Sequence, residues 1–144
     1  MLSKEYNIKQ IEAKWQKYWE KEHIYKFDEN SKKEIFSIDT PPPTVSGKMH
    51  LGHAFSYAHE DFVARYKRMN GFNVFYPFGT DDNGLATERL IEKLNNVKST
   101  QMPRKEFVEL CLNTLKKIRP EFANDWKKLA MSCDFNIFYT TINE

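Results

Sequence analysis

The pattern of apolar and polar positions near the start of the chain predicts an amphipathic helix from Asn7 to about Glu22, because apolar residues recur there every three or four positions. Asn7 is suited to cap this helix, and Gln10 follows three residues later, as in a capping box. Tryptophans at this spacing beside isoleucines favour packing in a core, or against another domain, over stacking on nucleic-acid bases. The apolar side consists of Ile8, Ile11, Trp15, Tyr18 and Trp19.

A strand, a helix and a second strand are predicted next. The apolar run within residues 34–39 is typical of a parallel strand that is covered on both faces. Apolar positions at helical spacing predict a helix over residues 51–69, which Asn70-Gly71 would end, and residues 73–78 predict the second strand. Together they predict a parallel βαβ unit with a right-handed crossover. The apolar residues of the helix are Leu51, Phe55, Phe62, Tyr66 and Met69.

The second half of the chain has a mainly helical pattern. Residues 84–95 predict a short helix, and residues 96–102 predict a loop. Pro103 stands where the first turn of another helix would begin, and Pro120 predicts the start of a further turn or helix. The aromatic and β-branched residues 134–141 predict a strand. Inward positions in the last helices are expected to be Phe107, Leu110, Cys111, Leu115, Ile118, Phe122, Trp126, Leu129 and Ala130.

One spatial relationship follows from the βαβ unit alone. The loops after its two strands, residues 40–50 and 79–84, leave the carboxyl ends of parallel strands and must lie at the same edge of the sheet. Neighbouring strands are only ~5 Å apart. We therefore expect Asp81 to face the loop at Pro41–Thr44 and the two histidines His50 and His53.

The loop after the first strand carries the strongest candidate chemistry. Three consecutive prolines hold its backbone extended, and Gly47 relieves the turn that follows. His50 and His53 are three residues apart and share one face of a helix at its start, where α/β proteins bind anions. Helix capping and a metal pair are the alternatives for the two histidines. No third Cys, His or acidic residue stands at zinc-motif spacing, so we predict no metal site.

Composition narrows the class of protein. The 144 residues suit one domain, and an apolar fraction of 40% is enough for a core. A net charge of +2 is too balanced to indicate nucleic-acid binding by itself. Cys111 and Cys133 lack CxxC spacing, and Cys111 is expected to be a reduced core thiol, while His23 and His59 are expected at the surface. No signal peptide or bilayer-spanning run occurs, so we expect a soluble, cytoplasmic protein with no membrane partner.

Two motifs carry a resemblance to a known family. Pro-Pro-Pro-Thr-Val-Ser-Gly-Lys-Met-His-Leu-Gly-His, residues 41–53, resembles the "HIGH" nucleotide-binding signature of class I aminoacyl-tRNA synthetases. The version with three prolines and Thr-Val-Ser-Gly most resembles the valyl enzymes of that family. Gly-Thr-Asp-Asp-Asn-Gly-Leu-Ala-Thr-Glu, residues 79–88, resembles their second conserved stretch. The likeness runs from about residue 11 to residue 141.

The resemblance implies an α/β fold, the first half of a class I synthetase Rossmann (parallel βαβ) catalytic domain with an N-terminal helix and a C-terminal helical segment. Residues 1–33 would be the N-terminal helix and connector. Residues 34–144 would be the first half of the catalytic domain, ending near the point where an editing domain would be inserted.

The implied activity is the ATP-dependent activation of valine, with Mg²⁺ accompanying ATP, and transfer of valine to tRNA-Val. His50 and His53 would be catalytic, and Lys48, His50, Gly52 and His53 would bind ATP. Asp81 would hold the ammonium group of the amino acid, whereas Asp82, Asn83, Thr87 and Glu88 stay open between a substrate role and a structural one. The residues implied for the amino acid are Pro41, Pro42, Thr44 and Asp81.

The family's second nucleotide motif, Lys-Met-Ser-Lys-Ser, is absent from this sequence. We therefore expect a piece that is inactive or weak alone and that needs the missing C-terminal part of the synthetase as a partner. Three alternatives remain open: an isoleucyl or leucyl relative, a nucleotidyltransferase without a role on tRNA, and a non-catalytic truncated relative that binds a synthetase or tRNA. Residues 79–88 favour a synthetase over the nucleotidyltransferase.

Overall fold

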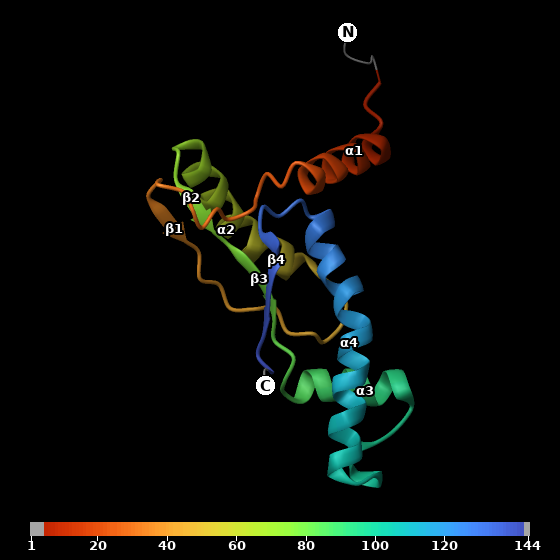
Figure 1. Ribbon diagram of the computed structural model, residues 1–144. Helices are drawn as coiled ribbons and strands as arrows, with labels where there is room; N and C mark the ends of the chain where they lie inside the picture. Colours follow the sequence, from red (N-terminus) through yellow and green to blue (C-terminus); the bar gives the residue numbers. More distant parts are fainter. Residues whose placement is uncertain (1–4, 143–144) are drawn as a thin grey trace.

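The chain combines helices with short parallel strands (Figure 1). The computed structural model describes residues 5–142. Over this range the elements are α1 (Ile8–Lys21), β1 (Ile35–Ser37), α2 (Leu51–Met69), β2 (Asn73–Phe75), β3 (Pro77–Thr80), α3 (Leu85–Asn95), the 3-10 helix η1 (Ser99–Gln101), α4 (Arg104–Lys128) and β4 (Asp134–Thr140). The predicted N-terminal helix, βαβ unit and final strand are all present.

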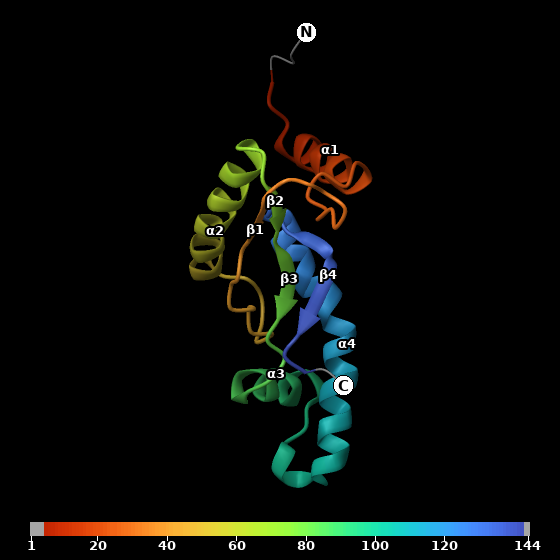
Figure 2. The same cartoon turned by 60° about the vertical axis from the view of Figure 1, so that its left-hand side comes forward.

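The strands form two parallel pairs. β1 pairs with β2 in parallel, with Phe36 opposite Val74, which confirms the predicted βαβ unit. The predicted second strand, residues 73–78, is interrupted at Tyr76, so that the prediction of one strand was wrong. Pro77 has no N–H to donate to a ladder, and from this point the chain pairs instead with β4. The two pairs lie end to end in the middle of the molecule (Figure 2).

The first strand is not covered on both faces, contrary to the prediction. Ile35 is 57% exposed, and Phe36 and Ile38 are only half-buried. Among the described strands, β1 has β2 as its one neighbour, so its other edge faces outward. An apolar run shows that a strand is suited to burial, but the partner that buries it must come from elsewhere.

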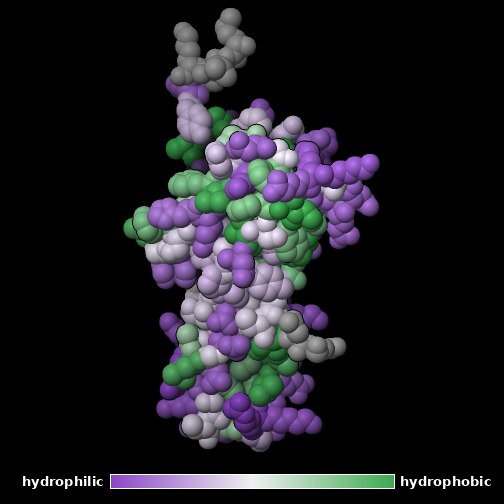
Figure 3. All heavy atoms as spheres, turned by 90° about the vertical axis from the view of Figure 1, so that its left-hand side faces the viewer, coloured by the Kyte–Doolittle hydropathy of each residue, from purple (hydrophilic) through white to green (hydrophobic). Residues whose placement is uncertain are grey.

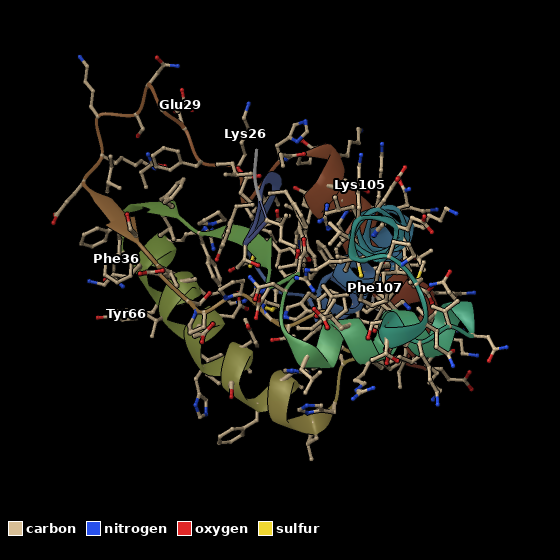
Figure 4. All side chains as sticks on the ribbon, turned by 90° about the horizontal axis from the view of Figure 1, so that it is seen from below. Lys26, Glu29, Phe36, Tyr66, Lys105 and Phe107 are labelled. Atoms are coloured by element: carbon tan, nitrogen blue, oxygen red, sulfur yellow. The ribbon has the colours of Figure 1, made fainter. Side chains whose placement is uncertain are left out.

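Helix α2 has the predicted bounds but turns its large apolar residues outward. Its buried residues are Asp61 and Ala64. Tyr66 projects away from the sheet (Figure 4), and hydrophobic side chains lie at the surface of the face that carries β1 and α2 (Figure 3). An apolar stripe of this kind on a helix is suited to packing against another element. The exposed fractions are 84% for Leu51, 65% for Phe55, 64% for Phe62, 59% for Tyr66 and 79% for Met69.

A buried polar network attaches the inner side of α2 to the loop before β4. Asp61 Oδ1 accepts hydrogen bonds from the backbone N–H and the hydroxyl of Ser132, and Asp61 Oδ2 accepts from Arg65. Arg65 also donates to the carbonyl of Ala130 and the hydroxyl of Tyr25. Since a buried carboxylate is tolerated only when its oxygens are paired, this network fixes α2 relative to β4.

The core lies where α2, α4 and β3 meet. Trp126 on α4 is fully buried, and its ring contacts Phe78 on β3 and Tyr57 on α2 at centroid distances of 5.8 and 5.7 Å. Tyr76 and Leu115 are also buried in this cluster. The predicted inward positions of α4 are confirmed for Phe107, Leu115, Phe122 and Trp126, which are buried, and for Leu110, Cys111, Ile118 and Leu129, which are half-buried against the core.

Helix α4 continues through Pro120, so the prediction that Pro120 starts a new turn or helix was wrong. An interior proline costs a helix about 3 kcal/mol, because one hydrogen bond is lost and the ring crowds the preceding turn. Phe122 and Trp126 follow it and are buried. Burial of each large side chain stabilises by about 1.5–3 kcal/mol, which offsets that cost.

Helix α1 has no buried residue, although its predicted cap is confirmed. Asn7 Oδ1 accepts a hydrogen bond from the N–H of Gln10. The predicted placement of its apolar side in a core was wrong for Trp15 and Tyr18, which are 42% and 46% exposed. Contact with another domain remains a prediction for this side. Both cysteines are free thiols, Cys133 buried and Cys111 half-buried.

Candidate functional site

The loop after β1, residues 40–50, contains three consecutive prolines and is called the proline loop below. The predicted proximity of Asp81 to this loop is confirmed. The N–H of Asp81 donates to the carbonyl of Pro43, and the N–H of Val45 donates to the carbonyl of Asp81, both at 2.9 Å. Thr44 and Asp81 thus form an isolated parallel bridge beyond the ends of β1 and β3. The loops that follow two strands are joined directly, as the edge rule for parallel sheets requires.

The carboxylate of Asp81 is held by hydroxyl groups and has no cationic partner within residues 5–142. Its Oδ2 accepts from the hydroxyl of Thr44 at 3.1 Å. Its Oδ1 accepts from the hydroxyl of Thr141 at 2.9 Å and from the backbone N–H of Asn83 at 3.4 Å. No ion pair of the described residues involves Asp81, so a full negative charge stands at the edge of the proline loop.

The neighbouring carboxylate of Asp82, unlike that of Asp81, is fully buried and paired with a cation. Asp82 is 2% exposed and forms an ion pair with Arg119 of α4. A buried charge needs such a partner, and the pair fixes α4 against the end of β3. Asp82, which the sequence left open between a substrate role and a structural one, is therefore structural and compensated, whereas Asp81 is half-buried and has no ion-pair partner among the described residues.

Two tyrosines hold the main chain of the proline loop. The hydroxyl of Tyr57 on α2 donates to the carbonyl of Pro41 at 2.7 Å. The hydroxyl of Tyr139 on β4 donates to the carbonyl of Thr40 at 3.3 Å. The ring of Tyr139 lies directly on Gly79, so a Cβ at position 79 would overlap the ring unless the ring moved. Burial raises the pKa of both tyrosines, which keeps their hydroxyls protonated as donors.

His50 and His53 form the start of α2 as a reciprocal capping box. The Nδ1 atom of His50 accepts from the N–H of His53 at 3.4 Å, and the Nδ1 atom of His53 accepts from the N–H of His50 at 3.5 Å. Their rings are stacked with centroids 3.8 Å apart. The capping alternative is therefore real, but it uses only one nitrogen of each ring.

The capping bonds determine which nitrogen carries the proton. A neutral imidazole has one donor and one acceptor nitrogen, so Nδ1 atoms that accept leave Nε2–H as the donor on each ring. The pKa of His53 lies below its ordinary value, chiefly because burial disfavours the charged form and also because His50 lies beside it. At neutral pH, His53 is thus a neutral Nε2–H donor at a helix N-terminus.

Gly52 lies beneath the ring of His50. A Cβ at this position would be 3.1 Å from two atoms of that ring, which is tighter than an ordinary contact. A side chain at position 52 would therefore push the ring of His50 by a few tenths of an ångström. Glycine avoids this close contact, whether or not it also makes room for a ligand.

Lys48 is exposed and lines a cavity of about 210 Å³ that neither His50 nor His53 lines. This cavity is bounded by Val45, Leu90, Phe122 and Asp125 among others. A larger cavity, of about 400 Å³, lies between α1, α4 and β4 and contains none of the predicted site residues.

The structure brings together most of the predicted site through shared neighbours. Pro41 is bonded to Tyr57, one turn beyond His53 on α2, and the rings of both Tyr57 and His53 contact Trp126. Among the described contacts, none joins Asp81 directly to either histidine.

His23 and His59 are exposed, as predicted. Within residues 5–142 no cluster of metal-ligating side chains occurs, and no helix there has the length and apolarity needed to cross a bilayer.

Tyr57, Tyr139 and Thr141 were missed by sequence reasoning. For Thr141 a signal was available, because it ends the predicted strand 134–141. A third parallel strand would place its carboxyl end at the same sheet edge as Pro41 and Asp81. The two tyrosines gave no comparable signal, because aromatic residues in a helix or a strand are more often core residues.

Nearly the whole chain is similar in sequence to known proteins. Residues 14–144 match the family described as tRNA synthetases class I (I, L, M and V). The chain belongs to this family. It is 51% identical over 135 residues to a valine–tRNA ligase of Thermoplasma volcanium, covering 94% of this chain and 17% of that protein. It is 48% identical over 141 residues to a valine–tRNA ligase of Rickettsia prowazekii, covering 97% of this chain and 17% of that protein.

The fold is that of the class I synthetases. The structure matches agnB2 LeuRS of Agrobacterium radiobacter K84, solved in a ternary complex with tRNA and LeuAMS, at a TM-score of 0.71 and 23% identity. The match covers 96% of this chain and 16% of that one. This synthetase chain therefore spans about one sixth of the length of the relatives that it matches.

Proposed function

We propose that this synthetase chain is part of a valine–tRNA ligase, in which it binds valine and ATP for the formation of valyl-adenylate. The observation that carries the proposal is the carboxylate of Asp81. It lies beside the proline loop without a cationic partner in residues 5–142, and both of its oxygens are oriented by hydrogen bonds. A carboxylate held in this way is suited to a substrate ammonium group.

The proline loop would supply the rest of the amino-acid site. Thr44 lies opposite Asp81, Pro41 and Pro42 precede it in the same loop, and Tyr57 fixes the position of the Pro41 carbonyl. Since proline lacks an N–H, the three-proline part of the loop has carbonyl groups and no backbone donors. Carbonyls and a carboxylate together favour an ammonium group over a neutral or anionic one.

The histidine pair would bind ATP. The Nε2–H groups of His50 and His53 are donors beside the start of α2, where the helix dipole also favours anions. In the reaction, an oxygen of the valine carboxylate bonds to the α-phosphorus of ATP as the bond to pyrophosphate breaks. Such donors would stabilise the charge that shifts onto phosphate oxygens. Gly52 would leave room for the nucleotide beside His50, and exposed Lys48 would reach a phosphate; Mg²⁺ would arrive with ATP.

The rest of the enzyme would complete this site. In our proposal residues 1–33 are a helix and connector, and residues 34–144 are the first half of a Rossmann-type catalytic domain near an editing insertion. The outward apolar stripe of α2 and the open edge of β1 support a missing partner, because both are suited to burial. That partner would be the C-terminal part, with the Lys-Met-Ser-Lys-Ser motif. The complete enzyme would charge tRNA-Val in the cytoplasm, where translation consumes it.

The test is ATP–pyrophosphate exchange, measured with valine, isoleucine and leucine in turn. We expect valine-dependent exchange from the full-length synthetase that contains this sequence, and little from the 144-residue chain alone. A preference for isoleucine or leucine would instead assign the chain to another branch of the family. Absence of exchange with all three amino acids would leave a non-catalytic relative.

Two substitutions connect the assay to the site. Asp81→Asn removes the charge and should raise the KM for valine by about tenfold or more, because hydrogen bonds to charged groups contribute about 1.5–3 kcal/mol. The matched control is Asp28→Asn, because Asp28 is an exposed aspartate on the connector before β1.

A variant of His50 should still cap helix α2, so His50→Asn is preferred to His50→Ala. Unchanged exchange in this variant would contradict the role of His50.

A further inference from the structure

The residue that follows β4 reaches the carboxylate of Asp81. The N–H of Thr141 donates to the carbonyl of Thr80 at 3.1 Å, which extends the pairing of β3 and β4 by one residue. The main chain of Thr141 is therefore held by the sheet rather than by a free loop. Its hydroxyl lies at the carboxyl edge, beside the residues that follow Thr80.

The hydroxyl of Thr141 uses all of its hydrogen-bonding capacity. It accepts from the N–H of Asp82 at 3.0 Å and from the side-chain amide of Asn83 at 3.1 Å. It donates to Oδ1 of Asp81 at 2.9 Å. A hydroxyl has one hydrogen and two lone pairs, so the two donors that approach it leave its hydrogen only one direction. That direction is the carboxylate of Asp81.

The two oxygens of Asp81 are consequently unequal. Oδ1 accepts from Thr141 and from the N–H of Asn83, which occupies both of its lone pairs. Among residues 5–142, Oδ2 accepts only from Thr44, and so retains one lone pair there. A cation that approaches this carboxylate meets a free acceptor site on Oδ2 alone, on the side of Thr44 and the proline loop.

We propose that Thr141 is a positioning residue for the amino-acid substrate: by saturating Oδ1 of Asp81, it directs the substrate ammonium to Oδ2. This inference rests on the proposed function and adds to it the direction from which the ammonium binds. Without the hydroxyl, the carboxylate loses a donor on one side, and Asn83 and the N–H of Asp82 lose their acceptor. Of the donors described above, the N–H of Asn83 and the hydroxyl of Thr44 remain, so the carboxylate is held less firmly in its orientation toward the proline loop.

The experiment uses the full-length synthetase that contains this sequence. Thr141→Val removes the hydroxyl and keeps the shape of the side chain, whereas Thr141→Ser keeps the hydroxyl. We expect Thr141→Val to raise the KM for valine by about tenfold in ATP–pyrophosphate exchange, with the KM for ATP and kcat within about twofold of wild type. Thr141→Ser should restore the KM for valine, which general loosening of the fold would not allow.

A matched control is Thr100→Val, because Thr100 is an exposed threonine on η1. It should leave both KM values unchanged. If Thr141→Val fails to fold, Thr141→Ala removes the same hydroxyl without the branched side chain. An unchanged KM for valine in the hydroxyl-free variants would overturn the role of Thr141 while leaving the proposed function intact. A wild-type enzyme without valine-dependent exchange would overturn both.

Discussion

The hydroxyl of Tyr57 donates a 2.7 Å hydrogen bond to the carbonyl of Pro41, and this bond joins helix α2 to the proline loop. Because His50 and His53 begin the same helix, the bond also fixes the distance between the histidine pair and the loop. The position of the amino-acid site relative to the nucleotide site would thus depend in part on this phenolic group.

Removing that group should weaken valine binding. Tyr57→Phe should raise the KM for valine in ATP–pyrophosphate exchange by about two- to tenfold, since a neutral hydrogen bond contributes about 0.5–1.5 kcal/mol. Tyr66→Phe is the matched control, because Tyr66 lies on the same helix and is 59% exposed. Equal behaviour of the two variants would show that the bond to Pro41 is dispensable.

Gly79 should be intolerant of any side chain. Gly79→Ala places a Cβ within the ring of Tyr139, and overpacking of this kind costs about 1–3 kcal/mol. The midpoint of urea unfolding should fall accordingly. In a Tyr139→Leu background the same substitution should cost less, because the ring is absent. If Gly79→Ala destabilises both backgrounds equally, the loss of stability arises from the main chain at residue 79 rather than from contact with the Tyr139 ring.

The ion pair of Asp82 and Arg119 should be essential for stability. Asp82→Asn or Arg119→Met leaves one buried or half-buried charge unpaired, at a cost of about 3 kcal/mol in the free energy of unfolding. The double variant should cost less than the sum of the two single ones. Lys128→Met provides the contrast, because its ion pair with Asp125 is largely exposed and should contribute little. Additive effects at Asp82 and Arg119 would argue against coupling.

Glu92 should make stability depend on pH in the acid range. Hydrogen bonds from the N–H and hydroxyl of Ser99, with a smaller contribution from Arg89, lower the pKa of Glu92 to about 2. Since the folded pKa lies below the unfolded one of 4.5, this stabilisation is full above pH 4.5 and is lost as pH falls toward 2. The urea midpoint of wild type should therefore exceed that of Glu92→Gln at pH 5.5 by more than at pH 3.

The Ser99→Ala variant is the control for this pH dependence, because it removes the hydroxyl donor to Glu92. It should reduce the change between the two pH values. A gap between wild type and Glu92→Gln that stays constant from pH 5.5 to pH 3 would show that the carboxylate is not specially stabilised.

Local signals in the sequence were sufficient for the boundaries of the main elements. Helix α2 begins after His50 and ends at Met69 as predicted, because its histidine start and Asn70-Gly71 end are both encoded nearby. The break at Tyr76 was missed, since Pro77 fits a strand start as well as a strand interior at an edge. Whether a strand or helix face is covered depends on partners distant in the chain, so the exposure of Ile35 could not be predicted.

For the candidate site, the sequence predicted which loops lie close together better than it predicted the contacts of individual side chains. Parallel topology alone placed Asp81 beside the proline loop. The same rule applied to β4 would have brought in Thr141. It could not distinguish Asp81 from Asp82, because only the packing of α4 shows that Arg119 neutralises the second carboxylate. Nor could it show that the two histidines cap the helix through their Nδ1 atoms.

The interlocked imidazoles of His50 and His53 restrict how this chain can evolve or be redesigned. Each ring has its Nδ1 committed to the start of α2, and in our proposal its Nε2–H binds ATP, so a replacement must satisfy two unrelated requirements at once. Asparagine supplies a short acceptor for the first requirement but lacks the reach of Nε2 for the second. Few of the common side chains satisfy both, which leaves little freedom to vary either position independently.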